Sequence, residues 1–497
     1  MSIAEFYKDQ EIFVTGATGF VGKALVEKLL RSCPKLGRIY VLMRPKKGVN
    51  IEDRLQQQWE TKLYDRLRQE QPDSRSKLVA IAGDVEQLGL GISPEDLERL
   101  KNVTIVYHSA ASVRFDDHLR SAILMNTRGT HELVKLALGW RKLKAFVHVS
   151  TTYSNPSVLE VEERVYPPIA DWRTTIKLAE TYDEETLDIF NLKYGNFQPN
   201  TYTFTKSLAE QVVNEYRDRL PVFIFRPSIV VSTIEEPVPG WADNFNGPTG
   251  LLVACGVGIL RSQNCDPHVV ADFVPADIVT RTLITSVFKF IKESEVKIKE
   301  KSDNDLYVVN CATANISPIT MGEVIEIGKT YIRENPFEKT LWLPGGSITM
   351  CPVLHFIRFI TQHLLMAAVV DTLLRLYNEK PFLMKLQRRI FAAFSALQVF
   401  AMTEWHFKND NFKALHKIVP MNEVPTFGFM QHADINYVDF FQHGIRGAKE
   451  FLLKESPESS SAARFRMKIF YVLDYLFRAI AYSFILRLIY KFLVSLW

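Results

Sequence analysis

The stretch that most constrains the fold begins at Glu11 and reads EIFVTGATGFVGKALVEKLL. A short apolar run, typical of a buried strand, leads directly into the spacing Gly16-x-x-Gly19-x-x-Gly22 and then into leucines at helical spacing. Glycines at these positions allow a tight turn, close approach of the backbone to a pyrophosphate, and close packing of helix on strand. The helix N-terminus also offers free N–H groups to phosphates. The sequence therefore predicts a dinucleotide site near its start.

The second predicted strand ends in a basic cluster. An apolar run over residues 38–43 follows the first helix at the distance that a parallel crossover requires, and Arg44, Lys46 and Lys47 come after it. An acidic residue here would bind the ribose 2′-hydroxyl of NAD, whereas a cation suits a 2′-phosphate. The pattern favours NADPH over NADH, although an ordinary solvated loop has the same composition.

Two further apolar runs extend the predicted parallel sheet. The run that ends at Ala82 is followed by Asp84, which either accepts a hydrogen bond from an adenine amino group or simply closes a turn. Residues 103–107 lead into small residues around Ala110, a composition that suits a nicotinamide ribose or tight packing of strand on loop. We expect Asn126, at the start of the next helix, to bridge backbone groups of the neighbouring strand.

A fifth apolar run, residues 145–149, ends in hydroxyl side chains. Ser150 and Thr151 follow it directly, and hydroxyls at the carboxyl end of a strand lie in the ligand crevice of a doubly wound sheet. The next segment, residues 155–199, is rich in Glu, Tyr and Pro and has only broken periodicity. We interpret it as an insertion that shapes a pocket or a lid.

Tyr202 and Lys206 are four residues apart, so on a helix they lie on the same face. A lysine ammonium beside a phenol stabilises the phenolate, lowers the pKa of the tyrosine and allows proton exchange with a carbonyl oxygen near neutral pH. An exposed helical pair has the same spacing. Downstream of a glycine turn and a strand that ends in Ser and Thr, the catalytic interpretation is favoured.

These features together resemble the extended short-chain dehydrogenase/reductase superfamily. Further stretches are similar to the alcohol-forming fatty acyl-CoA reductases, which are related to the plant male-sterility proteins, and the likeness covers most of the chain. The stretches are FRPSIV at 225–230, GWADNFNGPTGLL at 240–252, DFVPADI at 272–278, Lys380-Pro381, QRRI at 387–390 and EWHFKNDN at 404–411. One departure is LLMA at 364–367, where the family pattern has a proline before the alanine.

The resemblance implies NADPH-dependent reduction of a long-chain acyl-CoA to a fatty alcohol with release of CoA, in two hydride transfers. It implies that Thr151, or Ser150 as the adjacent alternative, hydrogen-bonds the carbonyl oxygen. Tyr202 would donate the proton, and Lys206 would tune Tyr202 and hold the nicotinamide ribose. The expected cofactor-binding residues are Thr15, Gly16, Thr18, Gly19, Phe20, Val21, Gly22, Arg44, Asp84, Val85, Ala110, Tyr202 and Lys206.

Composition narrows the function classes. A chain of 497 residues is too long for a single compact core and suggests more than one domain. Its formal net charge of +4, without a basic tract, gives no sign of nucleic-acid binding. The five cysteines are scattered without metal-ligand spacing, which favours a reducing compartment and predicts no metal site. The N-terminus has no basic and apolar pattern typical of a secretory signal.

The chain is expected to divide into an α/β reductase part with a Rossmann-type, doubly wound parallel sheet (1–345), an α-rich domain (350–455) and an apolar tail (465–497). Charged residues interrupt the apolar run at 353–376, so we expect that run and the next, 383–400, to pack as helices. The alternative is that one of them associates with a membrane. The tail is dense in Leu, Ile, Phe and Tyr, and we expect it to enter a membrane, as a span or a hairpin.

The predicted protein is therefore a reductase anchored by its tail in the endoplasmic reticulum or peroxisome membrane, with its catalytic domain in the cytosol. Two other functions fit parts of the pattern. One is a single-step dehydrogenase or epimerase acting on sterols or nucleotide sugars on the same fold. The other is a catalytically silent, lipid-binding scaffold. Acyl-chain preference stays open, and a homo-oligomer is possible.

Overall fold

A seven-stranded parallel sheet forms the core of the computed structural model, which describes residues 2–46, 48–115, 117–194, 198–297 and 306–495. Its strand order is β11-β7-β5-β4-β1-β2-β3, and every neighbouring pair is parallel. The strands are β1 (Glu11–Thr15), β2 (Arg38–Met43), β3 (Leu78–Ala82), β4 (Ile105–His108), β5 (Ala145–Val149), β7 (Val222–Pro227) and β11 (Val308–Cys311). This order and direction confirm the predicted doubly wound sheet.

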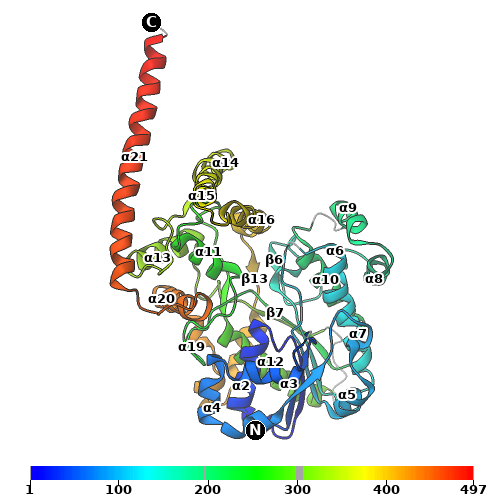
Figure 1. Ribbon diagram of the computed structural model, residues 1–497. Helices are drawn as coiled ribbons and strands as arrows, with labels where there is room; N and C mark the ends of the chain where they lie inside the picture. The colour runs from blue at the N-terminus through cyan, green and yellow to red at the C-terminus, as the bar shows by residue number, and fades with distance from the viewer. Residues whose placement is uncertain (1, 47, 116, 195–197, 298–305, 496–497) are drawn as a thin grey trace. The chain divides into compact units, whose positions relative to one another are not determined.

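Almost every residue of these strands is buried, because helices cover both faces of the sheet. Figure 1 shows α2 (Phe20–Ser32) and α12 (Ala276–Lys297) on one face, and α7 (Gly129–Ala137) and α10 (Thr201–Glu215) on the other. The strand β7 lies between β5 and β11 and was not predicted from the apolar pattern. The stretch at 225–230, which overlaps β7, was instead singled out for its resemblance to the family.

The chain folds into two compact units over its described residues. Unit 1 comprises residues 1–241, 270–319 and 395–436, and unit 2 comprises 242–269, 320–394 and 437–497. The units interleave along the chain, so they are divided differently from the sequence-based scheme of 1–345, 350–455 and 465–497. That scheme stays a prediction about functional parts.

Unit 1 contains the sheet and two short parallel strand pairs. The pairs are β6 (Glu160–Val161) with β13 (His406–Phe407) and β8 (Ile229–Val231) with β10 (Phe273–Pro275). Its further helices are α1 (Ile3–Phe6), α3 (Ile51–Trp59), η1 (Lys62–Tyr64), α4 (Asp65–Glu70), η2 (Pro72–Lys77), η3 (Leu88–Gly91), α5 (Pro94–Arg99), η4 (Leu100–Asn102), α6 (Leu119–Ala122), η5 (Ile123–Arg128), η6 (Thr152–Ser154), α8 (Trp172–Thr181), α9 (Glu184–Tyr194), α17 (Asp410–Lys417), η8 (Met421–Glu423), α18 (Val424–Phe427) and α19 (Met430–Ala433).

Unit 2 is mainly helical, and this confirms the predicted α-rich C-terminal region. Its short strands β9 (Ser262–Asn264) and β12 (Ser347–Thr349) pair in parallel. Its helices are α11 (Gly247–Gly256), α13 (Met321–Glu334), α14 (Pro352–Arg358), η7 (Phe359–Leu364), α15 (Leu365–Leu376), most of α16 (Leu383–Met402), α20 (Tyr437–Gly447), η9 (Ala448–Leu452) and α21 (Ser461–Ser495).

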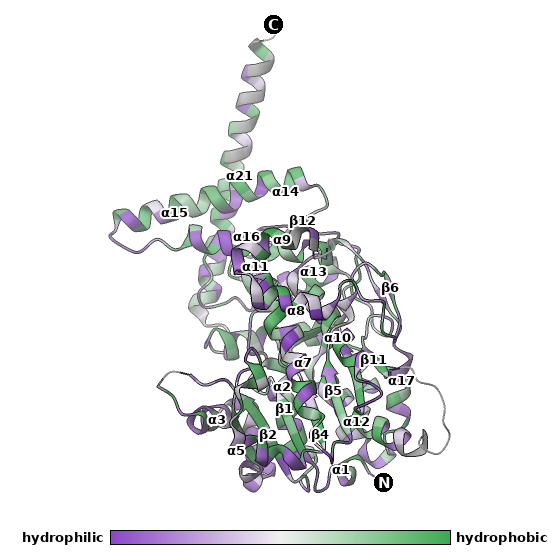
Figure 2. Cartoon of the chain, turned by 90° about the vertical axis from the view of Figure 1, so that its right-hand side faces the viewer, coloured by the Kyte–Doolittle hydropathy of each residue, from purple (hydrophilic) through white to green (hydrophobic). Residues whose placement is uncertain are grey.

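The two apolar helical regions of unit 2 differ in how well they suit a membrane. Among the described residues, Pro352–Leu376 is the helix that is long and apolar enough to cross a bilayer, judged by length and composition. Figure 2 colours most of α14 and α15 as hydrophobic. The tail helix α21 does not pass that test, and its buried Asp474 pairs with Arg261 at 3.2 Å and with Arg478 at 2.6 Å. The sequence pattern placed the expected membrane segment in the tail, whereas the segment of suitable length and composition among the described residues lies earlier in the chain.

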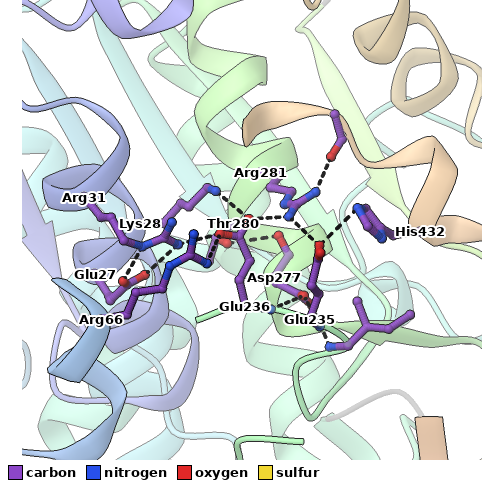
Figure 3. A network of polar contacts seen from close by, with 12 residues as sticks. Glu27, Lys28, Arg31, Arg66, Glu235, Glu236, Asp277, Thr280, Arg281 and His432 are labelled. Carbon is purple, nitrogen blue, oxygen red and sulfur yellow. Dashed lines mark hydrogen bonds and ion pairs between the residues drawn. The ribbon is translucent and has the colours of Figure 1, made fainter. Parts of the chain in front are cut away.

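A buried charge network joins α2, which follows the first strand, to Glu236 and to α12 (Figure 3). Glu236 accepts from Lys28 and Arg31 of α2 at 2.6 Å each, and it also pairs with Arg281 of α12. Burial alone would raise the pKa of Glu236, but the attraction of the surrounding cations outweighs burial and holds the pKa well below its usual value. Burial lowers the pKa of Lys28 to about 8.

Removing the Glu236 charge should strongly destabilise unit 1, because Glu236→Gln leaves Lys28 and Arg31 buried near each other without their shared carboxylate. We expect a loss of about 3–5 kcal/mol in the free energy of unfolding, measured by urea denaturation. Glu235→Gln is the matched control, because that side chain is 57% exposed and its pairing with Arg281 should contribute no more than about 1 kcal/mol. Equal effects of the two substitutions would contradict this role for Glu236.

Candidate active site

The glycine turn between β1 and α2 has the geometry that the sequence predicts. Gly16 has a φ of +74°, and a Cβ on Gly22 would lie 2.1 Å from the carbonyl oxygen of Gly16. Gly19 is the N-cap residue of α2, and no side chain among the described residues caps this helix start. The first-turn N–H groups, including those of Val21 and Gly22, are therefore available to an anion. A turn with glycines at these three positions and free N–H groups at the helix start fits a pyrophosphate.

The other predicted residues near the turn have different surroundings. Thr18 lies partly exposed within the turn, and Phe20 stacks on Trp241 at a ring distance of 5.0 Å. Thr15 is fully buried, where its hydroxyl contacts His108 Nδ1 at 2.7 Å and accepts from the Ala110 N–H at 3.2 Å. Thr15 therefore fixes the loop that carries Ala110 against β1.

Arg44 and Asp84, which were predicted to contact different parts of the cofactor, pair with each other. Arg44 Nε lies 2.9 Å from Asp84 Oδ2, and its Nη2 lies 3.1 Å from Glu86 Oε1. The Arg44 side chain is 53% exposed, so it can change partner at little cost. Val85 is buried beside Gly129, where a Cβ would lie 2.2 Å from a Val85 methyl group. Lys47 lies outside the described residues.

Tyr202 lies in the first turn of α10, which Asn200 caps by accepting from the Thr203 N–H at 2.9 Å. Burial raises the pKa of Tyr202 to about 12, and a hydrogen bond with Thr151 partly offsets this effect. The hydroxyls of Thr151 and Tyr202 are thus brought together at the carboxyl end of β5. At neutral pH Tyr202 is a phenol that can donate a proton.

Lys206 is buried one turn further along α10 and points to the end of β5. Its Nζ donates to the Val149 carbonyl at 2.6 Å and lies 3.4 Å from His148 Nε2. Burial lowers the pKa of Lys206 to about 7. The sequence suggested that Lys206 lowers the pKa of Tyr202. In this geometry Lys206 Nζ is directed to the Val149 carbonyl, and the contact that lowers the Tyr202 pKa is the hydrogen bond with Thr151.

Ser150, the alternative to Thr151, has a structural partner. Its hydroxyl donates to Glu210 Oε1 at 2.5 Å, and the same carboxylate forms a fully buried pair with Arg226 of β7 at 2.7 Å. Glu210 lies on α10, four residues after Lys206. Ser150 therefore helps to fix α10 on the sheet, while Thr151 contacts Tyr202.

Asn126 links α10 to the loop that follows β4, so it bridges backbone groups of that loop and not of the strand itself. Its side chain accepts from the Ser112 N–H at 2.9 Å, donates to the Ser112 carbonyl at 3.2 Å and donates to Thr205 Oγ1 at 2.9 Å. It lies in η5, a π-helical turn, and such turns are frequent at functional sites.

Sequence reasoning missed an aromatic cluster beside Tyr202. The Phe115 ring lies 5.7 Å from the ring of Tyr202 and stacks with Phe400, also at 5.7 Å. Tyr153 contacts Phe400 at 5.2 Å. No local spacing signals this cluster, because its members lie more than 30 residues apart and meet only in the fold.

The buried Lys206 should make stability depend on pH. Its folded-state pKa of about 7 lies below the unfolded value of about 10.4, so between these values the unfolded chain binds more protons and stability rises with pH. Between pH 7.5 and 9.5 the free energy of unfolding should rise by about 1 kcal/mol per pH unit more in the wild type than in Lys206→Met. Urea denaturation at these pH values measures the difference, and parallel pH dependences would refute it.

Comparison with known proteins identifies the family. A nicotinamide-dinucleotide-binding family model described as "Male sterility protein" matches residues 14–283 and indicates a nicotinamide cofactor, and a second model with that description matches 362–455. Fatty acyl-CoA reductase 1 of Xenopus laevis is 36% identical over 93% of this chain and 88% of its own length. Fatty acyl-CoA reductase 2 of Bos taurus is 34% identical over 98% of this chain and 93% of its own.

Solved structures agree on the fold. The terminal R domain from the myxalamid PKS-NRPS biosynthetic pathway aligns with a TM-score of 0.57 at 18% identity, and the alignment covers 91% of this chain and 93% of that one. The reductase (R) domain of a nonribosomal peptide synthetase from Mycobacterium tuberculosis aligns with a TM-score of 0.54 at 20% identity, over 88% and 92%. The sheet, the glycine turn and the sequence relatives together show that the chain belongs to the fatty acyl-CoA reductase family of oxidoreductases.

Proposed function

We propose that this protein reduces a long-chain fatty acyl-CoA to the fatty alcohol, with NADPH as reductant and free CoA as second product. The observation that carries the proposal is the convergence of the Thr151 and Tyr202 hydroxyls at the carboxyl end of β5, beside the buried Lys206. Two adjacent hydroxyl donors are what a carbonyl oxygen requires while it gains negative charge. Family membership supplies the substrate class.

The side chains of the site have separate roles in this proposal. A reduced nicotinamide, when bound over the strand ends, supplies the hydride for each reduction. Thr151 donates a hydrogen bond to the substrate carbonyl oxygen, and Tyr202 donates the proton that neutralises it. The raised pKa of Tyr202 suits this role, because the phenol stays protonated until the oxyanion forms. Lys206 holds the ribose hydroxyls at the end of β5.

The groups after β2 support the proposed preference for NADPH. Arg44 is exposed and pairs with the Asp84 and Glu86 carboxylates, so a 2′-phosphate can take their place as its partner. Lys46, also exposed, lies two residues further on and adds a second cation. NADH lacks the phosphate and would leave these cations without that partner.

The direct test incubates the full chain with palmitoyl-CoA and either NADPH or NADH, and measures thiol release, cofactor oxidation and lipid products by mass spectrometry. We expect hexadecanol, with about two NADPH oxidised for each thiol released. Tyr202→Phe should lower kcat by about 100-fold or more, since the proton donor is lost. Tyr182→Phe is the matched control, because Tyr182 is an exposed side chain at the end of α8.

Each part of the proposal has its own opposing outcome. Formation of aldehyde alone would exclude the alcohol-forming reaction, and unchanged turnover in Tyr202→Phe would exclude the proposed proton donor. Equal rates with NADH and NADPH would exclude the cofactor preference. If the preference is real, Arg44→Ala should weaken it by raising the KM for NADPH.

We further propose that the protein is bound to a membrane through Pro352–Leu376, with the outer half of α21 as a second element. Apolar side chains such as Val353 and Leu376 are more than 60% exposed on the first segment. On the second, Ile480 and Phe484 are also more than 60% exposed. Unpartnered apolar surface of this extent favours a lipid environment. The endoplasmic reticulum or peroxisome membrane, with the catalytic unit in the cytosol, stays the proposed location.

Flotation with phosphatidylcholine and phosphatidylserine vesicles tests this arrangement. The full chain should float with the vesicles. Binding to the vesicles should weaken in the triple variant Ile357→Glu/Leu365→Glu/Val369→Glu, and also in a chain that ends at Arg478, because each change removes exposed apolar surface. Binding should be lost when the triple variant and the truncation are combined. Wild-type flotation of the combined variant would overturn the proposal.

A further inference from the structure

An aromatic wall extends from Tyr202 into the part of unit 1 that follows residue 394. We define the wall as the rings of Phe115, Tyr153, Phe400 and Trp405. Phe115 contacts Tyr202, Phe400 stacks on Phe115, and Trp405 lies 5.6 Å from Phe400 and 5.4 Å from Tyr153. Each ring in this series is therefore less than 6 Å from the next.

The wall is apolar yet incompletely covered. Phe115, Tyr153 and Phe400 are each only partly buried, while Trp405 is buried and donates through Nε1 to the Pro156 carbonyl at 3.2 Å. Trp405 thus anchors one end of the wall, and the half-open rings lie between it and the hydroxyl of Tyr202. Open aromatic faces beside a proton donor indicate contact with an apolar part of a substrate.

A pocket of about 330 Å³ adjoins the anchored end of the wall. Trp405 and Phe407 line it together with Val270, Ala314 and Pro318. Phe407 also contacts Tyr153, at a ring distance of 5.1 Å. The wall and the pocket therefore share Trp405 and are joined again through Phe407. This volume is at the lower end of the range for ligand pockets.

The charges of the pocket oppose a phosphate group. The acidic residues Glu160, Asp272 and Glu404 line it, against Lys408, which pairs with Glu160 at 2.8 Å. Asp272 is fully engaged with its neighbours, since it accepts from Ser228 Oγ at 2.6 Å and from two backbone N–H groups. A phosphate-rich CoA moiety is disfavoured there, and an uncharged hydrocarbon chain suits the apolar lining.

We propose that the aromatic wall and this pocket bind the acyl chain, which lies along the rings from Tyr202 and places its distal end against Ala314 and Phe407. The inference rests on the proposed function and names the subsite that reads chain length. It also assigns Phe400, from the region that the second family model covers, to substrate binding next to Tyr202.

Filling the pocket tests the distal subsite. Ala314→Phe should lower kcat/KM for palmitoyl-CoA by about tenfold, the scale of losing a few buried methylene contacts, and leave octanoyl-CoA within about twofold of wild type. The backbone N–H of Ala314 that donates to Asp272 is kept in this variant. Ala462→Phe introduces the same side chain at an exposed helical position and should leave kcat/KM for both substrates unchanged.

Shortening the wall tests its contact with the chain. Phe400→Ala should raise KM for palmitoyl-CoA about tenfold with kcat within about twofold, because Phe400 touches the chain and not the reacting atoms. Val399→Ala, at an exposed neighbour on α16, is the control. Melting temperature and NADPH affinity, measured on each variant, show whether the fold is kept.

The outcomes separate the two levels of inference. A wild type that oxidises no NADPH with any acyl-CoA would refute the proposed function and the subsite with it. An active wild type whose Ala314→Phe variant loses octanoyl and palmitoyl turnover equally, or loses neither, would refute the subsite alone. A Phe400→Ala variant that lowers kcat for both substrates and melts earlier would show that Phe400 only supports the fold.

Discussion

The position of the candidate active site depends on one buried ion pair, between Glu210 of α10 and Arg226 of β7. A buried pair of this kind is costly to desolvate and demands good geometry, so it holds its two elements in a single register. Ser150, directly after β5, adds a second contact to Glu210. Because Tyr202 and Lys206 lie on the same helix as Glu210, this contact sets where both meet the strand end. Asn126 adds a separate link, from Thr205 of α10 to Ser112 in the loop after β4.

Local patterns predicted the parts of the fold that are local in origin. The apolar runs predicted the first five strands of the sheet, the glycine spacing predicted the turn before α2, and the spacing of Tyr202 and Lys206 predicted that the two lie on one helix. The Glu210–Arg226 pair and the contact between Phe115 and Phe400 could not be predicted in this way. Each joins residues whose meeting depends on the order of strands and on the return of the chain to unit 1, which periodicity does not encode.

The structure gives some of the predicted residues surroundings that differ from those expected from the sequence. A helical spacing of four suggested that Lys206 lowers the pKa of Tyr202, yet the Lys206 ammonium is directed to the Val149 carbonyl and burial dominates both groups. Similarly, composition counts Asp474 as a charge of the apolar tail, but in the fold this carboxylate accepts from Arg261 and Trp342 of unit 2. Burial and pairing are properties of the folded chain. Composition alone therefore counts charged side chains as exposed even where the fold buries or pairs them.

The return of residues 395–436 to unit 1 has a consequence for biosynthesis. The strand β13 pairs with β6, Asn409 donates to the Ala312 carbonyl, and Asn411 donates to that of Val308. A nascent chain that has just completed the sheet therefore still lacks the segment that pairs with β6 and places Phe400 on Phe115. Helices of unit 2 must emerge from the ribosome before that side arrives, so the enzyme matures late, when most of its polypeptide has already been translated.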